Sequence, residues 1–342
     1  MQSKSKILEK LITKTSSAWK IISSPSLLKI KVQLWISLLT QRFKAAIRLA
    51  PESVHFQNSE GLSDFNFYIS RSSDKEGVSV ILRVKNEEQK ILYCLQSVID
   101  IFDEIVFVDN GSEDNTLRLT QEFKQQFDSE DKIKIFHYPW KIARYGSEHQ
   151  ATPENSVHST AYYYNWVLSH CSFNYACKWD ADMVLSKEQR DRFKALLKVD
   201  VVKGDWRQYW IGGETVYRSL SNEFFLTSDV NWEPRIFPYS YFNRYYKDIY
   251  WESLYCSSKL KSDWSLGKVF YELKFSNENE FGNYNLEEFF GSIVNSINRT
   301  KQEWENMQFI QKGDFQKQKF IQLPPSFLDE QMPPPPSTIS NT

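Results

Sequence analysis

Residues 78–116 read VSVILRVKNEEQKILYCLQSVIDIFDEIVFVDNGSEDNT, and their pattern decides the fold class. Val78–Leu82 and Glu104–Val108 are short, β-branched apolar runs, which are typical of buried strands. Residues 87–100, between them, carry apolar side chains at helical spacing. A strand, a helix and a second strand in this order predict a unit of two parallel strands joined by a crossover helix.

The same alternation continues downstream and extends the predicted sheet. We expect helices at 114–127, with Ser112 or Asp114 near the cap, and at 155–169, and strands at 132–137 and 175–179. The sequence therefore predicts an α/β, Rossmann-like fold with a mostly parallel central sheet flanked by helices. After about residue 200 the pattern becomes aromatic and less regular, with a further helix expected at 285–305.

Polar side chains follow three of the predicted strands at the point where each strand ends. The three segments are Arg83–Glu88, Asp109–Ser112 and Asp180-Ala181-Asp182. Each alone reads as an ordinary turn or helix cap. Because ligands bind at the carboxyl ends of the strands in such sheets, the coincidence of the three segments predicts a ligand site at this edge.

The last of these segments has the chemistry of a metal site. Asp180 and Asp182 lie one residue apart where the chain leaves a strand, so both carboxylates can approach one divalent ion. Carboxylate oxygens suit Mg²⁺ or Mn²⁺, which is commonly shared with the phosphates of a substrate. The plain alternative is an exposed turn with two solvated acids. The two upstream segments favour the metal role.

Residues 78–185 resemble the inverting, GT-A-fold glycosyltransferases of the large family 2. The resemblance rests on four segments: Asn86-Glu87-Glu88, Cys94-Leu95-Gln96-Ser97, the run Val108 to Thr116, and Asn165 at the family's usual distance before Asp180. It covers about a third of the chain and is specific only in combination.

This resemblance implies a role for each matching residue. Asp109 would hydrogen-bond the nucleobase of a nucleotide-diphosphate sugar. The nucleotide would be lined by the turn that contains Arg83, Lys85, Asn86 and Glu87. Asp180 would lie near the ribose and the Mn²⁺ or Mg²⁺ ion, with Asp182 as the main metal ligand.

One residue departs from the family's pattern. Many members have Arg just before the Asn of the helix, and this chain has Tyr164 there. An Arg contact to the nucleotide would then come from Arg83 or Arg144, or be missing, which leaves the nucleotide's identity open.

Inverting transfer also needs a carboxylate base that accepts the proton of the attacking hydroxyl. Candidates in the second half of the chain are Glu214, Glu233, Asp248 and Glu252. The run Glu233 to Phe237, followed by Tyr250 to Leu254, resembles a subgroup that acts on lipopolysaccharide or capsule glycans. Its members carry His-Glu-x-Leu, and Trp251 replaces the His here. On this match we expect Glu252 to be the base; otherwise it is an ordinary acid on an aromatic-rich strand.

The N-terminal segment is distinguished by its charge. Residues 1–50 carry ten Lys and Arg and one acid, a net charge of +9, whereas the rest of the chain carries −10. Residues 4–22 and 26–49 are predicted to form amphipathic helices, which bind an anionic membrane surface, pack on the domain or dimerise. This charge gives no reason to expect nucleic acid. No apolar run approaches the roughly 20 residues that span a bilayer.

The four cysteines form no Cys-x-x-Cys pair, which favours a reduced, cytoplasmic location. If residues 1–50 bind a membrane, we expect the protein at its cytoplasmic face. We expect a helical extension and connector at 1–75, a nucleotide-sugar half at 76–200, an acceptor half at 201–325, and a disordered Pro-rich tail at 326–342.

The predicted activity is inverting transfer to a glycan or lipid-linked glycan. Two alternatives remain open. One is a non-catalytic module that binds nucleotide or glycan. The other is a sugar nucleotidyltransferase, which usually has a Gly-rich loop where this chain has Arg83 to Asn86.

Overall fold

The chain divides into two units, Met1–Glu52 and Ser53–Thr342, and the structure, a computed structural model, describes only the second. The described residues are 53–62, 64–68, 75–198, 207–257, 260–275, 280–286, 297–315 and 320–332. The two predicted N-terminal helices and the proline run 333–336 lie outside these ranges. Within them, no helix is long and apolar enough to cross a membrane.

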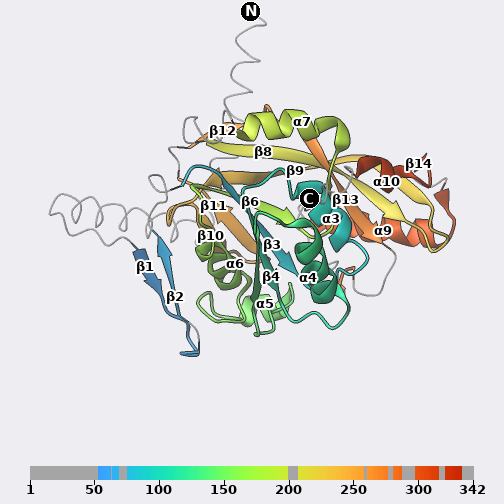
Figure 1. Ribbon diagram of the computed structural model, residues 1–342. Helices are drawn as coiled ribbons and strands as arrows, with labels where there is room; N and C mark the ends of the chain where they lie inside the picture. The colour runs from blue at the N-terminus through green and yellow to red at the C-terminus, as the bar shows by residue number, and fades with distance from the viewer. Residues whose placement is uncertain are drawn as a thin grey trace, which may run out of the picture. The chain divides into compact units, whose positions relative to one another are not determined.

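A ten-stranded sheet runs through the described unit (Figure 1). Its main path has the order β5-β4-β3-β6-β9-β8-β13-β7. The strands of this path are β3 (Val78–Val84), β4 (Glu104–Asp109), β5 (Ile133–His137), β6 (Tyr175–Asp180), β7 (Met183–Leu185), β8 (Arg207–Arg218), β9 (Phe224–Pro238) and β13 (Lys268–Phe275). β12 (Lys261–Asp263) pairs with β8, and β14 (Ile321–Leu323) pairs with β9.

The first half of the sheet is built as the sequence predicts. β5, β4, β3 and β6 are mutually parallel, and the longer helices between them are α3 (Ile91–Val98), α4 (Thr116–Phe127) and α6 (Thr160–Ser169). Asn115 is the N-cap of α4, and Asp114, expected near the cap, directly precedes it and accepts the N–H of Thr116 through a carboxylate oxygen at 2.9 Å. The α/β fold class is confirmed.

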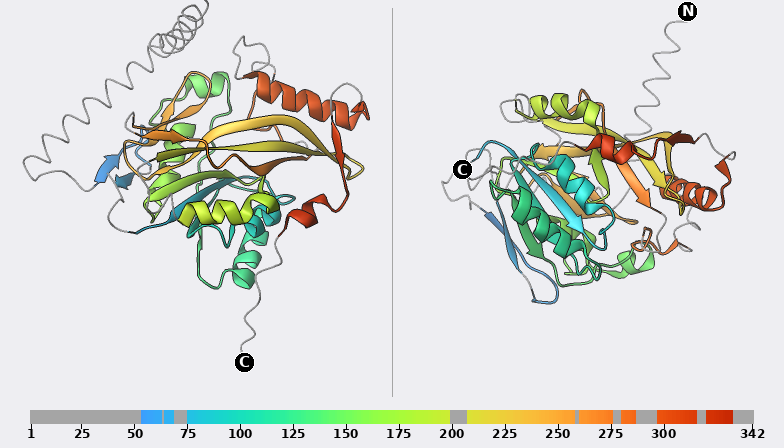
Figure 2. Two further views of the ribbon diagram at one scale, coloured as in Figure 1. Left: turned by 90° about the horizontal axis from the view of Figure 1, so that it is seen from above. Right: turned by 45° about the vertical axis from the view of Figure 1, so that its right-hand side comes forward.

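The second half of the sheet is mixed rather than parallel. β9 pairs antiparallel with both β6 and β8, while β8 and β13 are parallel and β7 is antiparallel to β13. Figure 2 shows β8 and β9 as two long yellow strands. The pairing of β6 with β9 joins the expected nucleotide half and the expected acceptor half into one continuous sheet.

Both faces of the parallel strands are buried, which explains their continuous apolar sequence. On β3, Val80 and Leu82 face the cluster that includes side chains of α3 and of α7 (Lys187–Leu196). Ile81 faces the opposite cluster, which contains tyrosines of α6 and the side chains of Phe65 and Phe67. The sheet is therefore the middle layer, and its carboxyl edge stays available for a site.

Two segments differ from the sequence expectations because they carry regular structure. The expected connector contains the antiparallel strands β1 (Ser53–Phe56) and β2 (Phe65–Tyr68). The expected tail contains α10 (Phe327–Gln331), in which Phe327 and Leu328 are buried. Their apolar side chains pack on the domain, which outweighs the polar and proline-rich surroundings.

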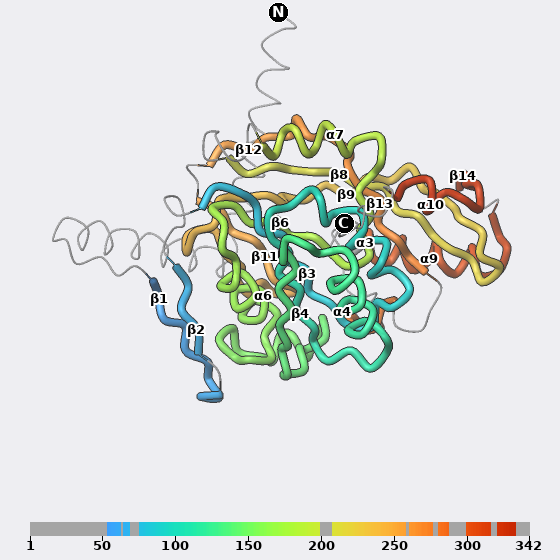
Figure 3. Tube along the Cα trace, in the orientation of Figure 1, coloured from blue at the N-terminus to red at the C-terminus, as the bar shows by residue number. Residues whose placement is uncertain are grey.

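The remaining elements are short or lie near the C-terminus. α5 (Ser147–Ala151) is a short helix between β5 and α6. β10 (Arg244–Lys247) and β11 (Glu252–Tyr255) form an antiparallel pair. The helix expected at 285–305 is α9 (Ile297–Gln311). Figure 3 shows α9, β14 and α10, in orange and red, gathered at one end of the sheet.

Gly213 on β8 allows the core behind β6 to close. A Cβ atom at this position would overlap the ring of Phe270, which packs against Trp179 with ring centroids 5.6 Å apart. We therefore expect Gly213→Ala to lower the free energy of unfolding by about 1–3 kcal/mol through overpacking. Denaturant unfolding measures this, and Gly213→Ala/Phe270→Leu should recover part of the loss. Additive effects of the two substitutions would contradict this packing account.

Candidate active site

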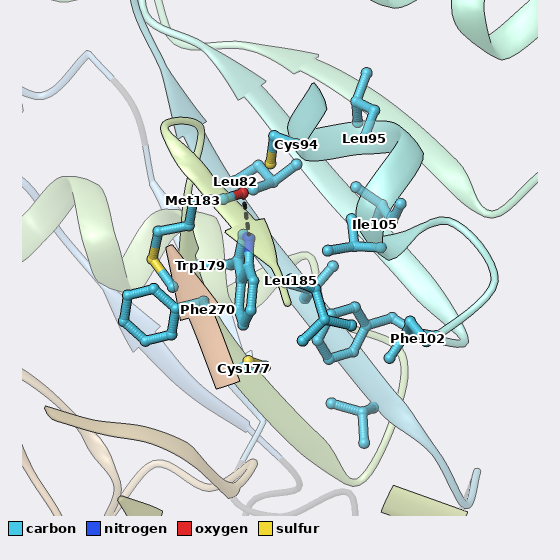
Figure 4. Close-up of a cluster of buried hydrophobic side chains, with 14 of the residues drawn as sticks. Leu82, Cys94, Leu95, Phe102, Ile105, Cys177, Trp179, Met183, Leu185 and Phe270 are labelled. Carbon is cyan, nitrogen blue, oxygen red and sulfur yellow. Dashed lines mark hydrogen bonds between the residues drawn. The ribbon is translucent and has the colours of Figure 1, made fainter. Parts of the chain in front are cut away.

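The turn that carries Asp180 and Asp182 is anchored to the core behind it. Trp179 is fully buried, and its indole N–H donates to the carbonyl of Met183 at 3.1 Å, closing the turn between β6 and β7 (Figure 4). The Cys94 thiol on α3 lies 3.7 Å from the carbonyl oxygen of Asp180. Because the indole and its partner are buried, the positions of both carboxylates are fixed by packing rather than by a solvated loop.

Asp180 is held between two arginines. Arg83 from β3 donates to one carboxylate oxygen at 2.6 Å, and Arg235 from β9 donates to the other at 2.8 Å. Burial alone would raise the pKa of Asp180, but Lys178 and the two arginines hold it well below its usual range. Asp180 is therefore ionised, and both of its oxygens are engaged.

Asp182 has a different environment. Lys274 from β13 donates to one of its carboxylate oxygens at 2.7 Å and also pairs with Glu272 at 2.9 Å. Burial raises the pKa of Asp182, and the Lys274 charge acts against this rise. Burial would lower the pKa of Lys274, but its four carboxylate neighbours, which include Glu280 and Glu303, raise it well above the usual value. Lys274 is thus a permanent cation beside Asp182.

These groups line one pocket of about 650 Å³, which we call the central pocket. Of the residues predicted from the sequence, Arg83, Lys85, Glu87, Asp180, Asp182, Glu233 and Glu252 line it. The structure thus brings the end of β3, the β6–β7 turn and the second half of the chain together. Asn86, Asp109, Glu214 and Asp248 are not among its lining residues.

Two of the predicted nucleotide-binding residues hold backbone instead. Asn86 has a positive φ of 57°, and its side-chain oxygen accepts the N–H of Glu113 at 2.8 Å. Asp109 is buried, and its carboxylate accepts the N–H groups of Gly111 and Ser112 at 3.1 and 3.2 Å. Both residues shape the loop after β4, while the neighbouring Asn110 lines the pocket. The nucleobase role of Asp109 stays a prediction.

Only two of the four candidate bases reach the central pocket, and they differ in charge environment. Glu233 is paired with Lys178 at 3.0 Å and Arg235 at 3.3 Å, and these cations hold its pKa well below its usual range despite its burial. Glu252 accepts a hydrogen bond of 2.7 Å from the hydroxyl of Tyr145. Since a strongly ion-paired carboxylate is a poor proton acceptor, the geometry favours Glu252.

Several pocket residues escaped the sequence reasoning. Lys274, Arg299 and Glu303 come from β13 and α9, in the part of the chain where no motif was recognised. Arg235 lies in the run Glu233 to Phe237, and no sequence signal indicates that it reaches Asp180, 55 residues earlier. Tyr164 stacks under Arg83, whose guanidinium lies 3.6 Å from the ring centroid. The guanidinium of Arg83 therefore lies next to Tyr164, the residue that departs from the family's pattern.

The ionisation of Glu303 makes the stability of the protein depend on pH. Burial and the nearby charge of Glu272 raise the pKa of Glu303 to about 7, although Arg299 and Lys274 lower it and Asp182 adds to the rise. An acidic group whose pKa is higher in the folded state stabilises the fold at pH values below its unfolded-state pKa. This stabilisation is lost as the pH rises through the folded-state pKa, here about 7. Glu303→Gln has no such titrating group, so only the unaltered protein loses this stability. The difference in unfolding free energy, variant minus unaltered protein, should therefore be more positive at pH 8 than at pH 5. The same difference at both pH values in denaturant unfolding would contradict this.

The carboxylates of the pocket fit a divalent cation in part. Eight carboxylates and six Lys or Arg side chains line the pocket, so its wall carries an excess of two negative formal charges. Asp182 has one oxygen without a hydrogen bond to any described residue, whereas both oxygens of Asp180 bond arginines. No group of three or more His, Cys, Asp or Glu in the described ranges is arranged to hold a metal alone. Asp182 therefore fits a cation whose other ligands come from a substrate's phosphates.

Comparisons with known proteins came to three results. The model of Glycosyl transferase family 2 matches residues 79–146. No curated protein matches the chain. S. aureus TarS 1-349 in complex with UDP-GlcNAc has 13% identity and a TM-score of 0.35, over 70% of this chain and 74% of that one.

Two further solved structures match shorter parts. Glucosyl-3-phosphoglycerate synthase from Mycobacterium tuberculosis, with Mg²⁺ and UDP, has 16% identity and a TM-score of 0.26, over 44% of this chain and 47% of that one. Mannosyltransferase PcManGT from Pyrobaculum calidifontis, with GDP-Man and Mn²⁺, has 18% identity and a TM-score of 0.28, over 44% and 38%. Each is matched over less than half its length, and likenesses this weak identify no shared substrate.

The family match covers the strand–helix–strand segment that begins the sheet and supplies Arg83, Lys85 and Glu87 to the pocket. Residues 79–146 thus match glycosyl transferase family 2, within an α/β, Rossmann-like fold of the GT-A type.

Proposed function

We propose that the chain is an inverting glycosyltransferase that moves a sugar from a nucleotide-diphosphate sugar to a hydroxyl group of a glycan. The observation that carries the proposal is that one pocket, the central pocket, is lined by Lys85, Asp182, Lys274 and Glu252. The match of residues 79–146 to glycosyl transferase family 2 supports the same reaction class.

The proposed chemistry assigns the proton transfer to Glu252. Its carboxylate accepts the proton of the acceptor hydroxyl while that oxygen forms a bond to C1 of the sugar. The bond between C1 and the diphosphate oxygen breaks on the opposite face, and the diphosphate leaves with the electron pair. Because the hydroxyl attacks from the face opposite the leaving diphosphate, the configuration at C1 is inverted. Tyr145 holds one oxygen of Glu252 through its hydroxyl.

The leaving diphosphate carries the charge that the pocket must stabilise. We propose that Lys85 and Lys274 face it and that Arg83, stacked on Tyr164, borders the nucleotide. A divalent Mn²⁺ or Mg²⁺ ion, when bound, would neutralise charge on the diphosphate. Asp182 would hold that ion. Asp180 would become a second ligand only by releasing Arg83 or Arg235, so the metal role predicted for Asp180 depends on that exchange.

Product analysis tests this proposal. The protein is incubated with Mn²⁺ and a panel of nucleotide sugars, and the expected product is free nucleoside diphosphate. Release of pyrophosphate would point instead to a sugar nucleotidyltransferase. Bound nucleotide with neither product would support a non-catalytic binding module.

For the acceptor, we propose a lipid-linked glycan, such as a precursor of lipopolysaccharide or capsule. The support is the net charge of +9 on residues 1–50, which suits an anionic membrane surface. Removing residues 1–50 should weaken binding to vesicles that contain anionic lipid. Unchanged vesicle binding would remove the membrane contact from the proposal.

A further inference from the structure

Several residues that line the central pocket have a buried polar atom with no hydrogen-bond partner among the described residues. These atoms are Nε of Arg83, Nε of Arg235, and the hydroxyls of Thr160, Tyr163 and Tyr245. Leaving a buried donor or acceptor unpaired costs free energy, so buried polar groups in folded proteins are nearly always paired. Unpaired groups collected along one pocket wall are therefore candidates for ligand contacts.

Tyr245 is the best supported of these because two side chains of α6 hold it in place. The side-chain amide of Asn165 donates to the Tyr245 carbonyl at 2.8 Å, and its oxygen accepts the Tyr245 N–H at 2.9 Å. The Tyr164 ring packs edge-on against the Tyr245 ring, with centroids 4.6 Å apart. Asn165 and Tyr245 are 4% and 2% exposed, so this arrangement lies inside the protein.

The position of Tyr245 places its hydroxyl near the proposed reaction centre. On the β10–β11 pair, Lys247 lies opposite Glu252, and Tyr245 lies opposite Leu254. Alternate residues of a strand share a face, so Tyr245 and Glu252 are on the same face of the pair. Burial raises the pKa of Tyr245 well above its usual value, with Glu252 and Asp180 among the nearby charges, so the hydroxyl keeps its proton.

A neutral hydroxyl in this position matches a neutral ligand group. The cations of the pocket, Lys85 and Lys274, suit the negative diphosphate. A protonated phenol, with Arg83, Glu252 and Asp180 among the nearby charges, suits the hydroxyl groups of a sugar, to which it can donate and from which it can accept.

We propose that the Tyr245 hydroxyl binds a hydroxyl group of the sugar part of the donor, and that Asn165 is a positioning residue that holds Tyr245 there. This inference rests on the proposed function, because it assumes a nucleotide-sugar ligand. Asn165 would act through its hydrogen bond to the main chain of Tyr245, which lies 80 positions later in the sequence.

Calorimetric titration of Tyr245→Phe tests the contact with two ligands. We expect affinity for the full nucleotide sugar to fall about 3- to 12-fold, the value of one hydrogen bond, while affinity for the matching nucleoside diphosphate stays within 2-fold. Tyr246→Phe is the matched control, since its side chain is also buried but does not line the pocket. It should change neither affinity.

The outcomes separate the two proposals. Equal losses for both ligands, or no loss for either, would overturn the sugar contact while leaving glycosyl transfer intact. If the unaltered protein binds neither ligand, the proposed function and this inference both fail. For Asn165, we expect Asn165→Ala to weaken binding of the nucleotide sugar and adding Tyr245→Phe to cause little further loss. Additive losses would contradict the positioning role.

Discussion

Replacing Glu252 with Gln is expected to lower the turnover number of sugar transfer by about 10²- to 10⁴-fold. Gln keeps the shape of the side chain and an oxygen that can accept the Tyr145 hydrogen bond, but it cannot take the proton of the attacking hydroxyl. Because the substitution removes a chemical step rather than a binding contact, affinity for the nucleoside diphosphate should be unchanged. Steady-state kinetics together with calorimetric binding separate these two effects.

The matched controls for Glu252 are the candidates that lie outside the central pocket. Glu214 is paired with Lys268 at 2.8 Å, and the Asp248 carboxylate accepts the N–H of Ile249 at 2.7 Å. Glu214→Gln and Asp248→Asn should keep turnover within a few-fold of the unaltered protein. Near-normal turnover in Glu252→Gln would remove Glu252 as the base.

The second large effect concerns stability. Arg235→Met is expected to lower the free energy of unfolding by about 3–5 kcal/mol, the usual result of removing one partner from a buried ion pair. Arg235 is 1% exposed and pairs with both Asp180 and Glu233, whose side chains are 34% and 28% exposed, so its loss leaves two partly buried carboxylates with one cation fewer each. Chemical denaturation at neutral pH measures the change.

An exposed ion pair provides the control for this substitution. Arg144 pairs with Glu148, and their side chains are 46% and 40% exposed. Arg144→Met should change the free energy of unfolding by less than about 1 kcal/mol, because solvent screens such pairs. A similarly small change in Arg235→Met would show that the cluster around Asp180 is not a buried structural unit.

The predictions from sequence succeeded where the signal was local. Strands β3, β4, β5 and β6 are short apolar runs separated by amphipathic helices, and buried parallel strands produce that pattern directly. The convergence of Arg83, Glu87 and Asp180 on one pocket followed from the rule that strands of one direction end at one edge. These inferences needed only neighbouring residues and general geometry.

The inferences that failed or were missed depend on contacts between distant residues. The antiparallel insertion of β9 between β6 and β8 is a choice among long-range pairings that periodicity does not encode. The partners of the two central carboxylates, Arg235 and Lys274, lie 55 and 92 residues further along the chain. Asn86 has a positive φ and accepts the N–H of Glu113, 27 residues later, a contact that no local pattern encodes, and its nucleotide role stays a prediction.

Metal-coupled binding of a nucleoside diphosphate tests the central claim most directly. Titration calorimetry compares the unaltered protein with Asp182→Asn, each with Mn²⁺ and then with a chelator. We expect one site in the unaltered protein that weakens at least tenfold when Mn²⁺ is removed, and no such metal dependence in Asp182→Asn. Equal affinity in both proteins, with or without Mn²⁺, would contradict a donor site built around Asp182.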